Sequence, residues 1–150
     1  MITNNSNTFF NSNKNIKNIK KNKQSICLNM IVKNEESNIE NCLTNLVKYI
    51  DFNYWVICDT GSSDNTIKII NDFFSRHDIS ISGELLQHKW VNFAHNRTLA
   101  LENAYNKSDY VLIFDADDLI EGKFILPETL ICDKYNLKFG ETFFYYRPCL

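Results

Sequence analysis

The sequence predicts an α/β fold in which a mainly parallel sheet is flanked by helices. Short, nearly continuous apolar runs alternate with amphipathic segments that have the 3.6-residue period of helices. The apolar runs are continuous rather than alternating, which is typical of strands buried on both faces of a parallel sheet. Polar turns rich in Gly, Ser, Asp and Asn separate these segments. With 150 residues, the chain has the size of one domain or part of one.

The first half of the domain contains two predicted strands and two predicted helices. Ile26–Val32 is an apolar run and predicts a buried strand. Residues 36–50 predict an amphipathic helix, because apolar side chains recur at i, i+4, i+7, i+8 and i+11 from Ile39. Residues 54–58 predict a second strand, and the polar turn after it ends in residues that cap helices. A second helix is predicted over residues 65–76.

The second half continues the alternation. Residues 85–88 predict a short third strand, and residues 94–105 predict a third helix. Residues 110–114 predict a strand that runs directly into the acidic sequence DADD. Residues 142–147 predict one more strand, in antiparallel orientation. Because strands joined by helical crossovers lie parallel, the order of segments predicts a mainly parallel sheet with both faces covered.

The charge of the chain is unevenly distributed. Residues 1–24 are rich in Asn and Lys, and we predict that they form a disordered tail because they cannot bury enough apolar surface to offset their ordering entropy. Residues 25–150 are the predicted folded domain, and acidic side chains outnumber basic ones there. The net charge of the whole chain is −2, which argues against a general nucleic-acid binder.

Three further features concern the cellular compartment. The sequence has no run of about 18 apolar residues, so we expect no transmembrane segment. The polar N-terminus lacks the apolar core of a secretory signal. The five cysteines form no CxxC pair, and we interpret them as reduced, buried thiols rather than as disulfides or a zinc site. These features together predict a cytoplasmic protein.

Polar side chains gather where the predicted strands end. Residues 33–36 follow the first strand, residues 59–64 follow the second, and residues 115–118 follow the strand at 110–114. In open parallel sheets, ligands bind outside the carboxyl ends of the strands. The sequence therefore predicts a binding site at this edge.

Asp115 and Asp117 have the spacing of two side chains on one side of an extended segment. Two adjacent carboxylates repel each other unless a cation or a proton lies between them. A hard divalent cation such as Mg²⁺ or Mn²⁺ suits them, because it takes few protein carboxylates and completes its shell with water and phosphate. The alternative is that Asp117 or Asp118 only caps a turn, and the spacing favours neither interpretation.

Three other polar residues near the strand ends have two possible roles each. Asp59 accepts a hydrogen bond from a ligand N–H, such as a nucleobase imide, or it satisfies N–H groups of its own turn. Gly61 allows a positive φ in that turn. Asp64 is predicted to be a helix N-cap. Arg97 either pairs with an anion near the start of its helix or is a solvated surface residue.

Four ring-bearing side chains before and at the start of the third predicted helix are assigned structural roles. His88 and His95 lack the paired spacing of metal ligands, so we interpret them as loop histidines with satisfied hydrogen bonds. Trp90 and Phe93 are predicted to close the core rather than to stack on a ligand.

Four segments together resemble a known family. They are ICLNMIVKNEESNIENCL, VICDTGSSDNTIKII, FAHNRTLALENA and DYVLIFDADDLIEG. In order and spacing they look like the family 2 glycosyltransferases of the GT-A fold, in the subtype that begins with a MIVKNEE-like motif. The resemblance covers residues 26–122.

The resemblance implies a metal-dependent, inverting transfer of a sugar from a nucleotide-sugar, by resemblance a UDP-sugar, to a glycan, protein or lipid acceptor. Residues 32–35 would border the base and ribose, Asp59 would accept from the uracil imide, and Arg97 would approach the base or the phosphates. Asp115 and Asp117 would hold Mn²⁺ or Mg²⁺ against the diphosphate. The implied nucleotide-sugar-binding residues are Val32, Lys33, Asn34, Glu35, Asp59, Gly61, Arg97, Asp115, Ala116 and Asp117.

The chain departs from that family at two points. Lys33 stands where many members have an aromatic residue that stacks on the base. Family domains also extend further beyond the DxD segment, so the domain is expected to be incomplete and truncated at its C-terminus. No general base is assigned, since Glu128, Asp133 and Glu141 are interpreted as surface charges.

Two alternatives to a complete glycosyltransferase stay open. In the first alternative, the chain is a non-catalytic or split nucleotide-binding fragment. In the second, it is a phosphotransferase of the haloacid dehalogenase type. In the latter, Asp115 would be the nucleophile and Asp117 the general acid/base.

Overall fold

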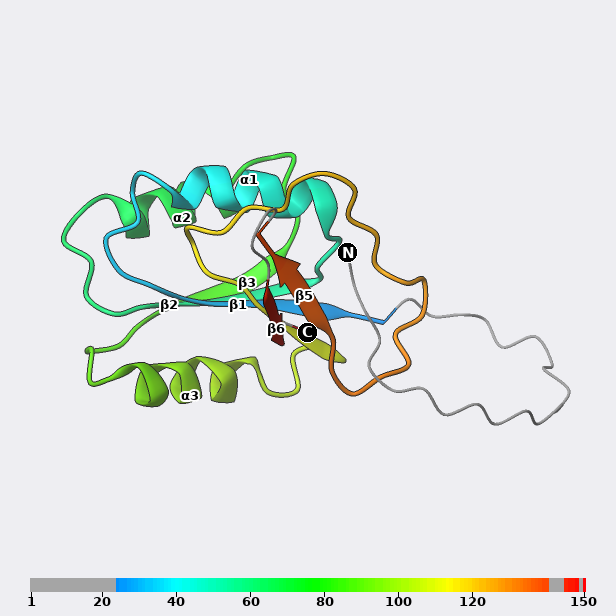
Figure 1. Ribbon diagram of the computed structural model, residues 1–150. Coiled ribbons are helices and arrows are strands. Elements are labelled where there is room, and N and C mark those ends of the chain that lie inside the picture. The colour runs from blue at the N-terminus through cyan, green and yellow to red at the C-terminus, as the bar shows by residue number, and fades with distance from the viewer. Residues whose placement is uncertain (1–23, 141–144, 149) are drawn as a thin grey trace, which may run out of the picture.

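The computed structural model describes residues 24–140, 145–148 and 150. Six strands and three helices occur in these residues (Figure 1). In chain order they are β1 (Ile26–Val32), α1 (Ile39–Tyr49), β2 (Tyr54–Asp59), α2 (Thr66–Phe74), β3 (Ser82–Gln87), α3 (Phe93–Ala104), β4 (Tyr110–Ile113), β5 (Asn136–Phe139) and β6 (Tyr145–Pro148).

The first four strands form one parallel sheet in the order β3-β2-β1-β4. Helices α1 and α2 cover one face of this sheet, and α3 covers the other (Figure 1). The predicted α/β class, with a mainly parallel sheet flanked by helices, is therefore confirmed. Because the strands are parallel, the segments that follow β1, β2 and β4 meet at one edge of the sheet.

Burial on both faces explains why the strands are continuous apolar runs. Successive side chains in β1 and β2 point to opposite faces of the sheet. Because helices cover both faces, the residues on each face have to be apolar. The α1 and α2 face carries the larger core, which includes Leu28, Met30, Leu43, Leu46, Ile57 and Ile70. The α3 face carries a smaller core of Cys27, Val56, Cys58, Ala100 and Ala104.

The predicted elements differ from the observed ones mainly at their ends. Helix α1 begins at Ile39 rather than at residue 36, because residues 36–38 form a turn in which the Glu35 carbonyl accepts from the Asn38 and Ile39 N–H groups. Strand β3 begins three residues earlier than predicted and pairs with β2 along its whole length.

A second, two-stranded sheet pairs β5 with β6 in antiparallel orientation. The antiparallel strand predicted at residues 142–147 corresponds to β6, although residues 142–144 lie outside the described residues. The prediction missed β5, whose sequence NLKF is too short to show a period.

Gln24 belongs to the ordered part of the chain, one residue before the predicted boundary. Its side chain donates to the Leu130 carbonyl (2.6 Å) and accepts from the Leu130 N–H (2.9 Å). The rest of the predicted tail, residues 1–23, lies outside the described residues. Among the residues that are described, no helix is both long and apolar enough to cross a membrane.

Gly83 lies against the ring of Trp55, and this contact leaves no room for a side chain. A Cβ at residue 83 would overlap the indole. The indole is itself fixed, because it stacks on Phe74 with 4.0 Å between ring centroids and donates to the Ile81 carbonyl (3.0 Å). We expect Gly83→Ala to lower the free energy of unfolding by about 1–3 kcal/mol, measured by chemical denaturation.

The control for this prediction is Ser82→Ala, at the exposed neighbouring position of the same strand. It should change the free energy of unfolding by less than about 0.5 kcal/mol. A Gly83→Ala variant as stable as the parent protein would show that Trp55 moves aside freely.

Candidate functional site

A cleft of about 250 Å³ lies at the carboxyl edge of the parallel sheet. Residues that follow β1, β2 and β4 line it together with residues at the start of α3. They are Ile31, Val32, Lys33, Glu35, Thr60, Trp90, Phe93, Asp115, Ala116 and Asp117. Larger hollows, of about 480, 440 and 400 Å³, lie elsewhere among the described residues. The last is lined by Asp109 and Asp133, but it lies beside Tyr110 at the start of β4, at the opposite edge of the sheet from the cleft.

Asp115 and Asp117 line this cleft from a turn rather than from an extended strand. Strand β4 ends at Ile113, and the Asp118 N–H donates to the Asp115 carbonyl (3.2 Å), as in a β-turn. The expectation of an extended segment was therefore wrong in its local geometry. Ala116 is buried between the two acids, and both acids still reach the same cleft.

Arg97 is almost fully buried, so its interpretation as a solvated surface residue is wrong. Its guanidinium donates to Asp115 Oδ1 (3.2 Å). In this ion pair, only 11% of the Arg97 side chain is exposed. The cation lies near the positive end of the α3 dipole, where an anionic partner is needed to offset the repulsion. The Arg97 guanidinium thus ties α3 to the acidic turn after β4.

Asn29 holds Arg97 from the other side and was missed by the sequence analysis. It is fully buried in β1, where its Nδ2 donates to the Ala100 carbonyl (2.9 Å). This bond directs Oδ1 toward Arg97, whose Nη1 donates to it (3.2 Å). The sequence signal that could have revealed Asn29 is a single amide side chain within an otherwise apolar strand. A buried amide needs hydrogen-bond partners, so it indicates a polar contact in the core.

The Asp59 carboxylate is turned into its own loop. It is 2% exposed and accepts from the N–H groups of Gly61 (2.9 Å) and Ser62 (3.0 Å), and also from the Ser62 hydroxyl. Gly61 has the positive φ, +101°, that the sequence predicted. Asp59 and Gly61 do not line the cleft, although their neighbour Thr60 does.

Asp64 lies one residue before the N-cap of α2, which is Asn65, so the predicted cap position was wrong by one. Asp64 nevertheless accepts from the Thr66 N–H (3.0 Å) and thereby satisfies a donor of the first turn. Its other oxygen accepts from the Glu36 N–H (3.1 Å). Asp64 therefore connects the start of α2 to the loop after β1.

The loop after β1 is fastened to the loop after β2 by further hydrogen bonds. Asn34, at a φ of 55°, accepts at Oδ1 from the Ser63 N–H (2.8 Å), and its own N–H donates to Ser62 Oγ (2.8 Å). The Glu35 N–H donates to Thr66 Oγ1 (2.7 Å). The Asn34 amide thus supports the loops, while Val32, Lys33 and Glu35 line the cleft.

Trp90 and Phe93 do not close the core as predicted. Trp90 is 44% exposed and Phe93 is 61% exposed, and both line the cleft beside the two acids. They were misassigned because the sequence does not show which face of the loop after β3 meets solvent.

The structure places His88 and His95 in different surroundings. The interpretation of His88 as satisfied is wrong, since its buried Nε2 has no hydrogen-bond partner in the described part of the chain. His95 is exposed, and its backbone N–H donates to the Asn92 side chain that caps α3. Within residues 24–140, 145–148 and 150, no three His, Cys, Asp or Glu side chains gather in a group that can hold a metal ion.

Cys42 lies behind the acidic turn. Its Sγ donates to the Asp115 carbonyl (3.6 Å). Burial, together with the negative charges of Asp118 and Asp117, raises the pKa of this thiol to about 12. The thiol is therefore protonated at neutral pH.

A parallel α/β sheet with a charged cleft at its carboxyl edge is the architecture of many enzymes that bind nucleotides. The sequence model of glycosyl transferase family 2 matches residues 27–129, which include every residue lining the cleft. The chain therefore belongs to glycosyltransferase family 2, and its fold is GT-A-like. No curated protein sequence matches the chain significantly.

Proposed function

We propose that the chain binds a UDP-sugar in the cleft and transfers the sugar, with inversion, to a hydroxyl group of a glycan, protein or lipid acceptor. The observation that carries the proposal is the ion pair between Arg97 and Asp115, which fixes one acid beside Asp117 in a cleft inside the family match. The membership in family 2 supports a glycosyltransferase over a phosphotransferase of the haloacid dehalogenase type.

The donor set of the cleft fits a Mg²⁺ or Mn²⁺ ion. These ions bind through one or two carboxylates and take their remaining ligands from water and phosphate. Asp115 and Asp117 would hold the ion, with Asp115 positioned by its ion pair with Arg97. When bound, such an ion supplies Lewis-acid stabilisation of the departing nucleoside diphosphate.

The protein's own side chains would bind and orient the donor. The Arg97 guanidinium, paired with Asp115, would place a positive charge beside the diphosphate site. Lys33, exposed at the rim of the cleft, offers a positive charge to the diphosphate. Asp59 would support the loop at this edge rather than accept from the base, because its buried carboxylate accepts from Gly61 and Ser62 and does not line the cleft.

The general base stays unassigned. Glu128 lines the hollow beside Ile26, at the start of β1, and Asp133 lies beside Tyr110, at the start of β4. Both are thus at the opposite edge of the sheet from the cleft, which supports their interpretation as surface charges. Glu141 lies outside the described residues. A nucleotide-binding fragment that needs another chain for turnover is the second candidate.

Calorimetric titration with UDP, in MnCl₂ and then in EDTA, tests the proposal. We expect saturable binding in Mn²⁺ that EDTA removes. Release of UDP from UDP-sugars by the same preparation distinguishes an active enzyme from a binding fragment. Absence of UDP binding in Mn²⁺ and in Mg²⁺ would contradict both candidates.

The cysteines support a cytoplasmic location, since Cys27, Cys42, Cys58 and Cys132 are free thiols. Burial raises the pKa of Cys27 and of Cys58 to about 11, and that of Cys42 to about 12. A thiolate is the reactive form, so at pH 8 these three thiols should resist alkylation in the native protein. We expect peptide mass spectrometry to find them unmodified in buffer and fully modified in denaturant.

The half-buried Cys132 is the internal comparison in this labelling experiment. Native-state labelling of Cys27, Cys42 or Cys58 as fast as in denaturant would mean that the cores on the two faces of the sheet open readily.

A further inference from the structure

We propose that Trp90 and Phe93 form an aromatic face of the cleft that stacks on the nucleobase of the donor. This inference rests on the proposed function and adds the residues that would select a ligand with a planar ring. It starts from the two rings that the sequence analysis assigned to the core and that the structure places in the cleft.

The exposure of these rings is concentrated in one place. Trp90, Val91 and Phe93 are 44%, 57% and 61% exposed, and they lie within four consecutive residues. Large apolar side chains that are exposed together, rather than singly, mark a binding surface. Here the exposed rings share one cleft with Asp115 and Asp117. The cleft therefore has an aromatic side and a charged side.

The loop that carries Trp90 is held in place, so the outward position of the ring is built into the fold. The Asn96 side chain, 1% exposed, accepts from the Val91 N–H (3.0 Å) and donates to the Lys89 carbonyl (3.1 Å). These two bonds bracket Trp90 in the sequence. The Asn92 side chain then caps α3 through the His95 N–H (2.9 Å), which fixes the position of Phe93.

Phe93 is also connected to the charged side of the cleft. The Arg97 guanidinium lies 5.7 Å from the centre of the Phe93 ring, within the range of a cation–π contact, and the same guanidinium pairs with Asp115. The aromatic face and the carboxylates are thus adjacent rather than at separate ends of the molecule. A ligand with a planar ring linked through a short spacer to phosphates matches this arrangement.

A nucleobase fits this face better than a sugar ring does. Bases are planar and stack on Trp and Phe, an interaction that alanine substitution typically shows to be worth about a tenfold change in affinity or more per base. Lys33, the residue at the end of β1 that lines the same cleft, has no ring to offer. Trp90 and Phe93 are the aromatic side chains that line the cleft among the described residues.

The test compares Trp90→Ala and Phe93→Ala with the parent protein in calorimetric titrations with UDP and with inorganic pyrophosphate, each in Mn²⁺. We expect each variant to bind UDP about tenfold more weakly. Pyrophosphate has no base, so its affinity should change less than about twofold. Circular dichroism and thermal denaturation of each variant confirm that the fold is retained.

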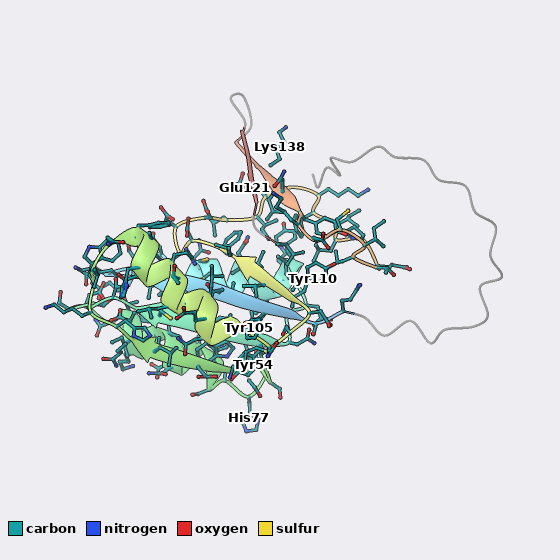
Figure 2. All side chains as sticks on the ribbon, turned by 90° about the horizontal axis from the view of Figure 1, so that it is seen from below. Tyr54, His77, Tyr105, Tyr110, Glu121 and Lys138 are labelled. Carbon is teal, nitrogen blue, oxygen red and sulfur yellow. The ribbon has the colours of Figure 1, made fainter. Side chains whose placement is uncertain are left out.

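Tyr105→Ala is the matched control. Tyr105 is 75% exposed and follows the last residue of α3, whereas Phe93 is the first residue of that helix. Figure 2 places Tyr105 near Tyr54 and Tyr110, which begin β2 and β4 at the edge opposite the cleft. Removing this ring should leave the affinity for UDP unchanged.

Tryptophan fluorescence provides a second readout. The chain has two Trp residues, and Trp55 is 6% exposed and stacked on Phe74. Stacking of a base should quench Trp90, so UDP should quench the parent protein but not Trp90→Phe. Pyrophosphate should quench neither.

The outcomes separate the two proposals. A parent protein that binds neither UDP nor pyrophosphate overturns the proposed function and this inference with it. A parent protein that binds UDP, with both alanine variants equally tight, overturns the inference alone. Equal losses for UDP and pyrophosphate also overturn it, as does a loss confined to UDP-sugars and absent with UDP, which would assign the face to the sugar.

Discussion

Asp117→Asn is expected to weaken Mn²⁺-dependent binding of UDP by at least about 100-fold. Substitutions of residues that only support a metal ligand typically cost 10–100-fold in metal affinity, so loss of a charged ligand should cost at least as much. The amide keeps the size of the carboxylate but removes its charge. Because Asp117 is exposed in the cleft and not in the core, the fold should be unaffected. Calorimetric titration with UDP in Mn²⁺ measures the effect.

Asp118→Asn is the control for this substitution. Asp118 is the next residue in the same turn but does not line the cleft. The Asp118→Asn variant should therefore lose only the small long-range contribution of that charge to the affinity for the cation. If Asp118→Asn is as defective as Asp117→Asn, the effect comes from the overall charge of the turn. If Asp117→Asn binds UDP normally in Mn²⁺, the metal assignment is wrong.

Arg97→Met is expected to reduce both stability and binding. The substitution removes the partner of a buried amide oxygen in Asn29 and of the Asp115 carboxylate. Breaking a buried ion pair typically costs about 3–5 kcal/mol. We expect about 2 kcal/mol here, because 37% of the Asp115 side chain is exposed and water can replace part of the lost interaction. For a chain of this size, the melting temperature should fall by roughly 6 °C.

Arg76→Met is the matched comparison for Arg97. Arg76 pairs with two acids, Glu40 and Asp78, but at 3.6 Å each and with 43% of its side chain exposed. Exposed ion pairs contribute little, so this variant should lose less than about 1 kcal/mol. Equal melting temperatures for the two variants would contradict a structural role for the buried pair. Arg97→Lys should retain the positive charge but lose the pair of hydrogen bonds by which the guanidinium joins Asn29 to Asp115.

The sequence was sufficient to predict the parallel sheet because its information is distributed over many residues. The apolar run of β1 and the helical period of α1 each extend over several residues, and β1 occurs where expected while α1 begins three residues later. The acidic turn and the loop after β1 were expected to meet, since parallel strands end at one edge of the sheet. Strand β5, with four residues, has too few positions to reveal a period.

Side-chain directions were harder to predict because they depend on contacts between distant elements. The sequence allowed Asp59 to bind either a ligand or its own loop. In the structure its carboxylate turns into the loop, where it accepts from the N–H groups of Gly61 and Ser62. Arg97 is buried because Asn29, which lies 68 positions earlier in the sequence, offers it an oxygen. Neither side-chain orientation follows from composition or spacing.

The most direct test of the account is a crystal of the protein grown with UDP and Mn²⁺, with diffraction data collected at the manganese absorption edge. The account predicts an anomalous peak bonded to carboxylate oxygens of Asp115 and Asp117 and to the diphosphate of UDP. Manganese bound elsewhere, or UDP seated in the cleft with no metal at these two acids, would contradict it.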